Sequence, residues 1–447
     1  MTAFELSAGT PTPEEYADAV FTAAASSLDL KAETIPFTEA LGRTLAQRLT
    51  APGPMPPFAN SQMDGYALTA AAATRELREF TVGTDVPAGG STAGLGVDDD
   101  TVYPIMTGAP LPSGYSAVVP EEQAQPLGAR EGTFAAAGTR VRLPRTEPGR
   151  FVRLPGEDVA AGQTLAEAGT RLNAAHIGTL AAHGISSVEV TRAPRVLIIT
   201  GGEEIAADPE HLRHSSVIRD ANGPMLAAMV ERAGAHVRHL HTGDDPARLS
   251  QLLTETFAEF TPDLVLSSGG ISHGKFEVVR LACERMPEVT QAWFGHVGQQ
   301  PGGPQGLISL RFSTAAGRER TATWVALPGN PVSTLVSYRL FVHPVLRHAG
   351  NTEAALALSA PVRAGARTGV LNEPDELTGL ADKVQFRRGT AAALPWKDGT
   401  LTTELSVDPA TGSHQLHRAS NANALIAIPA GARLSAGAQL TWYSLTE

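Results

Sequence analysis

One pattern occurs three times between Arg195 and Gly350: an apolar strand runs into a turn of small residues, and a helix follows the turn. The expected strands are residues 196–200, 264–268 and 324–327, and the turns begin at Gly201, Gly269 and Pro328. Strands that alternate with helices form a parallel sheet through right-handed crossovers, so the three turns gather outside the carboxyl ends of the strands. Glycine lets the backbone approach a ligand, and helix N-termini attract anions. The sequence therefore predicts a cleft that binds phosphate or another oxyanion at this edge.

The composition is typical of a globular chain with several domains. With 447 residues, 42% of them apolar, the chain is long enough for about three domains. The single cysteine, Cys283, excludes an intramolecular disulfide and is expected to be a buried helix thiol. The segment from Met1 to Thr10 lacks the features of a signal peptide, and no run approaches the ~20 apolar residues of a spanning helix, so we expect a cytoplasmic protein. A net charge of −11 argues against nucleic-acid and membrane partners.

Local signals predict several elements outside the repeated pattern. Thr12, Pro13 and Glu15 form a capping box with proline at the first helical position, which predicts a helix to about Ser27. A second short helix is expected after Thr38. The stretch 51–152 is rich in proline and glycine and favours short strands, including a solvated, arginine-rich face after residue 139.

Between Gly156 and Val190 the pattern becomes helical, with an apolar face around Leu180 and a stop at Gly184, and the α/β segment follows. After Gly350, short alternating runs such as 401–405 and 424–428 predict a β-barrel or sandwich. Two helices of the α/β segment should face the core with Leu226, Met229, Val230 and Ala233, and with Leu249, Leu252, Leu253 and Phe257.

Residues 269–275 nearly match two catalytic motifs, and we reject both. The pattern G-x-x-x-x-G-K lacks the hydroxyl residue that a P-loop needs after its lysine, because Phe276 follows Lys275. The pattern G-x-S-x-G around Ser272 has no identifiable oxyanion-hole loop, acid or histidine to complete it. The histidines His211, His214, His236, His239 and His241 do not form one local metal site, since His239 and His241 share a strand face from which His236 points away. We interpret them as exposed strand or loop residues.

Carboxylates near the glycine turns are more informative. Glu203, Glu204, Asp220 and Glu277 would lie close to a bound phosphate, where hard oxygen ligands hold Mg²⁺. For Glu203 and Glu204 a second interpretation stays open, namely stabilisation of a helix start by its dipole.

An ordered set of motifs links the chain to a known family. In chain order the motifs are Pro57–Ala67 (PFANSQMDGYA), Thr107-Gly108-Ala109, Arg153 with Gly156-Glu157-Asp158, Thr200-Gly201, Asp220 with Asn222, Ser268–Ser272, and Leu327–Ser333. From about Gly42 to Pro429 the chain resembles the molybdopterin molybdotransferases, the family of bacterial MoeA and the gephyrin E-domain. The resemblance implies an α/β multidomain fold in four parts: a split helical/linker domain (1–50 and 150–193), an inserted β-rich domain (51–149), a three-layer α/β molybdopterin-binding domain (194–349) and a C-terminal β-barrel (350–447).

The resemblance also implies a reaction and a site. The family inserts molybdate into adenylylated molybdopterin in a Mg²⁺-dependent step that releases AMP, and it acts as a homodimer in which Asp64, Thr107 and Glu157 of the partner complete each site. The resemblance likewise implies the catalytic residues Asp64, Thr107, Glu157, Asp220, Lys275 and Glu277. The candidate metal ligands are Glu203, Asp220 and Glu277. The substrate would be held by Thr200, Gly201, Gly202, Ser268, Gly269, Gly270, Ser272, Pro328, Gly329, Asn330, Pro331, Ser333 and Ser413.

The chain departs from the family in its positive charge. Where the family has a Lys-Pro-Gly-Lys-Pro segment, both lysines are replaced, by Gln300 and Gly303. Lys275 is the one lysine between residues 194 and 349, and our hypothesis is that it supplies the missing charge together with Arg219 or Arg280. The loss leaves a second function open: a catalytically weakened relative that binds molybdopterin as a carrier, scaffold or regulatory module.

Overall fold

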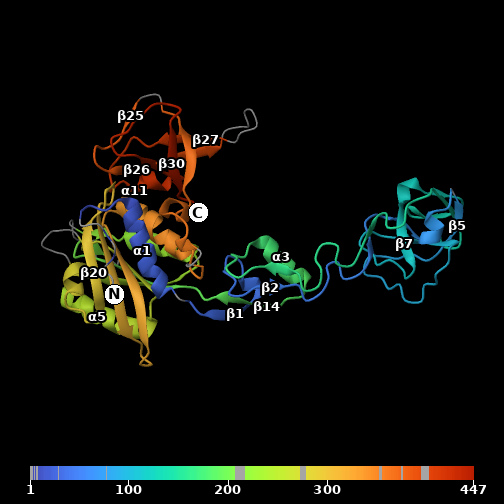
Figure 1. The fold of residues 1–447 in the computed structure, drawn as a ribbon, viewed down its shortest axis with the longest axis horizontal. Coiled ribbons are helices and arrows are strands. Elements are labelled where there is room, and N and C mark those ends of the chain that lie inside the picture. The colour runs from blue at the N-terminus through green and yellow to red at the C-terminus, as the bar shows by residue number, and fades with distance from the viewer. Residues whose placement is uncertain are drawn as a thin grey trace. The chain divides into compact units, whose positions relative to one another are not determined.

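The computed structural model describes residues 4, 6, 9–28, 30–76, 78–206, 217–271, 278–351, 355–373, 376–393 and 402–446. Their contacts divide the chain into two compact units (Figure 1). Unit 1 contains Met1–Thr34, Gly42–Ala46 and Glu189–Glu447, and unit 2 contains Ile35–Leu41 and Gln47–Val188. The chain thus leaves unit 1 to build unit 2 and returns, as expected for an inserted domain.

A six-stranded sheet forms the centre of unit 1. Its strand order is β18-β15-β19-β23-β22-β20. The first four strands run parallel to one another, β22 pairs antiparallel with β23, and β20 pairs antiparallel with β22. The strands are β15 (Arg195–Gly201), β18 (His236–Thr242), β19 (Leu264–Ser268), β20 (Val289–His296), β22 (Pro304–Ser313) and β23 (Glu319–Leu327). The three predicted strands therefore lie side by side and parallel, and their turns meet at one edge.

Helices cover both faces of this sheet because the strands alternate their apolar side chains. Val196, Ile198 and Leu266 pack toward α4 and α1, whereas Leu197, Ile199 and Val265 pack toward α5 and α6. The helices of unit 1 are α1 (Pro13–Ser27), α4 (Asn222–Arg232), α5 (Pro246–Phe260), α6 (Val278–Cys283), α7 (Pro331–Ser337), a π-helical turn (Tyr338–Val342), α8 (His343–Arg347), α10 (Ala360–Arg363) and α11 (Leu416–Ser420). The three-layer α/β prediction is confirmed. Both predicted stripes face the core, with Met229, Ala233 and Leu252 half-buried and the other members buried.

Helix α1 begins with the predicted capping box. Thr12 Oγ1 accepts from Glu15 N at 3.1 Å, and Glu15 Oε2 accepts from Thr12 N at 2.8 Å. The helix packs on β23, and Tyr16 donates its hydroxyl proton to Gly306 O at 3.0 Å (Figure 1, blue against orange). The first residues of the chain thus help to cover the α/β sheet, although the family pattern groups them with residues 150–193.

The first of the three repeated patterns contains an excursion that the sequence did not indicate. Between β15 and α4 the chain forms β16 (Ile205–Ala206), which pairs in parallel with β17 (Ile218–Arg219). Residues 207–216, with His211 and His214, and residues 272–277, with Ser272, Lys275 and Glu277, lie outside the described residues.

The C-terminal part of unit 1 is a closed barrel, which confirms the prediction. Strands β26-β27-β24-β30-β28 follow one another, and β28 pairs with β26 to close the ring. The strands are β24 (Arg367–Leu371), β26 (Val384–Ala393), β27 (Thr403–Val407), β28 (Ala424–Ile428) and β30 (Gln439–Ser444), with a separate pair β25 (Leu377–Thr378) and β29 (Arg433–Leu434). Strand β21 (Gln299–Gln300) pairs with β26 and thereby ties the segment after β20 to the barrel.

Unit 2 consists of short strands, as its proline and glycine content predicts. Its main sheet has the order β7-β4-β6-β5-β11-β8: β4 (Gly65–Thr69), β5 (Arg78–Val82), β6 (Thr101–Ile105), β7 (Tyr115–Pro120), β8 (Gln125–Pro126) and β11 (Arg140–Leu143). Its two-stranded pairs are β2 (Leu49–Thr50) with β13 (Thr164–Ala166), β3 (Asn60–Ser61) with β12 (Val152–Arg153), and β9 (Arg130–Glu131) with β10 (Phe134–Ala135). The strands β1 (Ala32–Pro36) and β14 (Ser187–Thr191) also pair, and each contains residues assigned to both units. The helices are α2 (Ala70–Ala73) and α3 (Ala174–Ala182), and the short helix expected after Thr38 is instead a 3₁₀ turn at Phe37–Glu39.

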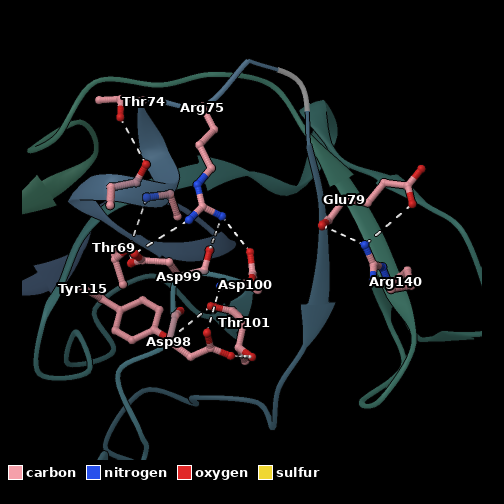
Figure 2. A network of polar contacts seen from close by, with 12 residues as sticks. Thr69, Thr74, Arg75, Glu79, Asp98, Asp99, Asp100, Thr101, Tyr115 and Arg140 are labelled. Atoms are coloured by element: carbon pink, nitrogen blue, oxygen red, sulfur yellow. Dashed lines mark hydrogen bonds and ion pairs between the residues drawn. The ribbon is translucent and has the colours of Figure 1, made fainter.

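Figure 2 shows how ion pairs fasten the loop before β6. Arg75 Nη1 donates to Asp99 O at 3.1 Å and to Asp100 Oδ1 at 2.7 Å, and Thr69 Oγ1 donates to Asp99 Oδ1 at 2.5 Å. On the neighbouring strands Arg140 Nη2 donates to Glu79 O at 3.0 Å. The arginine-rich stretch thus begins as a solvated β-face paired with an acidic neighbour.

No helix built from the described residues has both the length and the apolar character needed to cross a bilayer.

Cys283 is expected to resist thiol reagents in the folded protein. It lies buried in α6, and burial raises the pKa of its thiol to about 12. Because the thiolate is the reactive species, modification at pH 8 should be roughly 1000-fold slower than in the unfolded chain. A disulfide-exchange chromogen added with and without denaturant measures both rates, and equal rates would contradict the buried position.

Candidate functional site

A cleft of about 1160 Å³ opens in unit 1 where the repeated turns meet. Its walls come from the ends of β15, β19 and β23, from the start of α4, and from two segments that the strand pattern did not predict, residues 300–304 and the barrel loop 411–414. The cleft therefore lies at the carboxyl ends of parallel strands, the place where ligands bind in open α/β sheets.

The glycines of the turns allow backbone segments to approach closely. A Cβ atom on Gly201 would lie 1.8 Å from Thr242 O, so no larger residue fits at the end of β15. In the second and third turns a Cβ on Gly329 would lie 3.4 Å from the Cα of Gly269, whose N–H donates to Leu327 O at 3.0 Å. These turns present backbone rather than side chains to the cleft, as a phosphate-binding surface requires.

Hydroxyl groups fix the third turn. Thr334 Oγ1 donates to Pro328 O at 2.7 Å, and Ser268 Oγ lies 3.1 Å from both Pro328 O and Thr334 Oγ1. All of these groups are buried, so their hydrogen bonds act in a medium of low dielectric constant and hold the turn firmly. The serine at the end of β19 thus orients the turn after β23.

Asn222, at the start of α4, connects the first turn to the third. Its Nδ2 donates to Gly329 O at 2.6 Å, whereas its buried Oδ1 has no partner among the described residues. A buried carbonyl oxygen without a donor costs about 1–3 kcal/mol. Because Asn222 lines the cleft, its Oδ1 is a candidate acceptor for a ligand N–H or O–H.

Asp220 lies beside Asn222 and is held by three neighbours. Thr200 Oγ1 is 2.5 Å from Asp220 Oδ2 and 2.6 Å from His239 Nε2, and Gly223 N donates to Asp220 Oδ1 at 2.9 Å. His239 Nε2 is 3.6 Å from Asp220 Oδ2. Burial lowers the pKa of His239, an effect that the nearby Asp220 carboxylate opposes. The carboxylate is thus oriented from three elements, β15, β18 and α4.

The barrel supplies the last wall through a loop that a buried arginine holds. Arg388, on β26, donates to Ala410 O at 2.7 Å and to Gln415 O at 2.8 Å, at the two ends of the loop. Ser413 O accepts from Val332 N at 3.0 Å and so joins the loop to α7. The loop is thereby fixed against the α/β domain within unit 1.

The described cleft lining carries more negative than positive charge. Glu204, Asp220 and Asp244 contribute three carboxylates, and Arg219 is the one permanently charged cation on the described part of the lining. The segment around Gln300, where the family has lysines, lines the cleft without a charge. No group of three or more histidine, cysteine, aspartate or glutamate side chains in the described ranges could hold a metal ion.

Comparison with known proteins decides the family. Residues 12–184 match the MoeA N-terminal region (domain I and II), and residues 197–348 match the probable molybdopterin binding domain. A molybdopterin molybdenumtransferase 2 of Mycobacterium tuberculosis (strain ATCC 25618 / H37Rv) is 36% identical over 422 residues, which cover 92% of this chain and 95% of the relative. The chain belongs to the molybdopterin molybdenumtransferase family.

Other relatives agree with this assignment. A molybdopterin molybdenumtransferase of Synechococcus elongatus is 32% identical over 327 residues, 72% of this chain and 76% of that protein. The crystal structure of a molybdopterin biosynthesis moeA protein from Pyrococcus horikoshii OT3 superposes with a TM-score of 0.72 over 98% of this chain and all of that chain, at 22% identity, and shows the shared fold. The resemblance inferred from the motifs is therefore confirmed.

Most residues predicted to hold the substrate line one cleft. Those that do are Thr200, Gly201, Gly202, Ser268, Gly269, Gly270, Pro328, Gly329, Asn330, Pro331, Ser333 and Ser413. Asp220, predicted as a catalytic residue and metal ligand, lines the same cleft. Glu203 is not part of the lining; its N–H donates to Asp244 Oδ2 at 3.3 Å. Ser272, Lys275 and Glu277 lie outside the described residues, so their roles stay predictions.

The residues assigned to the partner subunit lie in unit 2, where the structure joins two of them. Asp64 Oδ1 accepts from Thr107 N at 2.7 Å and from Thr107 Oγ1 at 2.8 Å, and these hydrogen bonds hold the pKa of the Asp64 carboxyl below its usual range. Glu157 Oε2 accepts from Leu154 N at 2.8 Å. The antiparallel pair β3–β12 joins the two stretches of chain, but Asp64 follows β3 and Glu157 follows β12, so the two carboxylates extend from opposite ends of the pair.

Sequence reasoning missed Asp244 on the cleft lining and the contact of His239 with Thr200, and it identified the loop 411–414 only through Ser413. His239 is an exposed strand residue that shares a face of β18 with His241, as expected, but the sequence does not predict its contact with Thr200. The strand pairing offered a signal for this contact. His239 lies on the same face of the sheet as Ile198 and Thr200 of β15, and this face is covered by α4. A polar ring on a strand face that otherwise packs apolar side chains indicates a polar partner.

Proposed function

We propose that the protein is an enzyme of molybdenum cofactor biosynthesis that inserts molybdate into adenylylated molybdopterin and releases AMP. The observation that carries this proposal is the cleft in which Gly201, Gly269 and Gly329 present backbone at the carboxyl ends of three parallel strands. Membership of the molybdopterin molybdenumtransferase family supports the substrate class.

The reaction that we propose breaks a phosphoanhydride bond, so the site must hold a charged phosphate tail. The glycine turns leave room for phosphate oxygens to reach backbone N–H groups, and Asn222 Oδ1 can accept from the ligand. The hydrogen bonds of Thr334 and Ser268 keep the third turn in place before substrate arrives. Such preorganised donors stabilise charge that develops in the transition state.

The chemistry of the cleft fits Mg²⁺ that is bound together with substrate. Mg²⁺ is commonly held by one or two carboxylates, with phosphate oxygens and waters as its other ligands, rather than by a cage of protein groups. Asp220 supplies such a carboxylate at the cleft wall, and Glu203 and Glu277 are the further candidates from the sequence. When bound, the metal would neutralise charge on the departing phosphate.

We propose further that the active unit is a homodimer with shared sites. Asp64, Thr107 and Glu157 would be contributed by one subunit to the cleft of the other. Three properties of Asp64 support this proposal: its carboxyl is ionised, its side chain is exposed, and Thr107 orients it. A carboxylate that is to act in the cleft of another subunit needs all three.

The second candidate function, a carrier or scaffold that binds molybdopterin without turnover, is favoured by the uncharged Gln300 segment in the cleft. The two functions share a fold and differ in the site, so chemistry must decide between them. Adding molybdate and Mg²⁺ to the protein with adenylylated molybdopterin should release AMP in an amount exceeding the enzyme. Chromatographic quantification of AMP is the measurement, and a control without molybdate gives the background. Tight pterin binding without AMP release would establish the carrier function instead.

A further inference from the structure

A single hydroxyl group lies between an acid and an imidazole at the edge of the cleft. Thr200 Oγ1 is 2.5 Å from Asp220 Oδ2 and 2.6 Å from His239 Nε2. Thr200 is buried, and the Asp220 side chain is 10% exposed, so water does not substitute freely for these contacts. Asp220 and Thr200 line the cleft, whereas His239 does not.

Counting protons assigns the direction of both hydrogen bonds. A threonine hydroxyl has one proton, and an ionised carboxylate only accepts, so the Thr200 proton points to Asp220 Oδ2. The short contact to His239 Nε2 then needs a proton from the ring, which places N–H at Nε2. This assignment holds for the neutral and the protonated ring alike, since both can carry that proton.

The surrounding backbone is shaped to this arrangement. Gly223 N donates to Asp220 Oδ1, so both carboxylate oxygens have a defined donor. A Cβ atom on Gly223 would lie 2.3 Å from His239 Cε1 and 2.6 Å from Asp220 Oδ2. Only a glycine at the second position of α4 lets the ring and the carboxylate pack together.

We propose that His239 is a positioning residue for the reaction: its Nε2–H donates to Thr200 Oγ1, which directs the single Thr200 proton to Asp220 and fixes the carboxylate facing the cleft. Without this donor the Thr200 hydroxyl can rotate, and Asp220 loses one of its two fixed hydrogen bonds. The catalytic consequence rests on the proposed function, whereas the tautomer of His239 does not.

Kinetics test the catalytic consequence. We expect His239→Ala to lower kcat about 10-fold to 100-fold, the usual cost of losing a group that orients a ligating carboxylate. The KM for adenylylated molybdopterin should change less than about twofold, because His239 does not touch the cleft. His239→Gln places an amide N–H near the former Nε2 and should recover most of kcat. His236→Ala, on the opposite face of β18, is the matched control and should equal wild type.

The outcomes separate this inference from the proposed function. Nitrogen-15 NMR of the histidine-labelled protein, with the His239 signal assigned by its loss in His239→Gln, should show the proton on Nε2, and Thr200→Val should shift that signal. A proton on Nδ1 with a bare Nε2 overturns the inference, whether or not the wild type turns over. Failure of His239→Gln to exceed His239→Ala in kcat, with both proteins folded, also overturns it. Absence of molybdate-dependent AMP release in the wild type overturns the proposed function alone.

Discussion

Mixing two inactive variants, Asp64→Ala and Asp220→Ala, should restore AMP release to about a quarter of the wild-type rate. If the partner's Asp64 completes the cleft that contains Asp220, a mixed dimer has one site with both carboxylates and one with neither. Random pairing makes about half of the dimers mixed, and each has one working site of two. Either variant alone should lose about 100-fold or more, because each removes a charge that acts at the reacting phosphate. Co-expression with two different tags, followed by AMP quantification, measures the effect.

A matched pair of variants provides the control. Asp220→Ala and Thr200→Val both alter the same cleft, so no mixed dimer contains an intact site and mixing should restore nothing. An active Asp64→Ala variant would remove Asp64 from the mechanism. A mixture that stays inactive while both tags co-purify would show that each cleft is completed within its own subunit.

Sequence patterns within short stretches correctly predicted the helices and strands whose formation depends on neighbouring residues. The capping box of Thr12 and Glu15 correctly predicted α1, because those hydrogen bonds join residues three apart. The apolar runs before Gly201 and Gly269 predicted parallel strands whose turns meet, since crossover handedness leaves few alternatives. The short alternating runs after Gly350 predicted a barrel or sandwich, including β28 with the expected bounds.

Contacts between distant segments were beyond that reasoning. The pairing of β16 with β17 lies between the turn at Gly201 and α4, and the repeated pattern of strand, turn and helix does not indicate it. Helix α1 shows the same limit: its capping box was evident, but its partner β23 lies about 300 residues later, and local patterns do not identify partners. The role of His239 depends on Thr200 and Asp220, which come from two other elements.

The cleft was predicted from the sequence because glycine turns at the carboxyl ends of parallel strands let the backbone approach a ligand. The barrel loop around Ser413 was identified only through the resemblance to the family. Arg388 orients that loop from β26, and no sequence pattern singled this arginine out. The arginine is 3% exposed, and its guanidinium binds carbonyl oxygens that no sequence pattern connects to it. Long-range hydrogen bonds from buried arginines thus set part of the site that local patterns leave undefined.

Replacing Arg219 by alanine should raise the KM for molybdate about tenfold or more. The described lining contains three carboxylates against one permanent cation, a balance of −3 + 1 = −2, which repels a dianion entering the cleft. Arg219 projects from β17 beside Asp220 and carries that one positive charge. Arg219→Lys should retain much of the affinity but not all of it, since a guanidinium donates to an oxyanion through two N–H groups and an ammonium acts as a point charge.

The two other candidates for the missing charge serve as comparisons. Arg280 lies outside the described lining, with its Nε 3.8 Å from Glu284 Oε1, so Arg280→Ala should leave the KM for molybdate unchanged. Lys275→Ala tests the remaining part of the compensation hypothesis, and an unchanged turnover would remove Lys275 from it. Raising the ionic strength should lower the KM of Arg219→Ala more than that of the wild type, because screening weakens the net repulsion by the carboxylates, which is larger in the variant. A KM that stays constant in Arg219→Ala and rises in Lys275→Ala would instead assign oxyanion binding to the lysine.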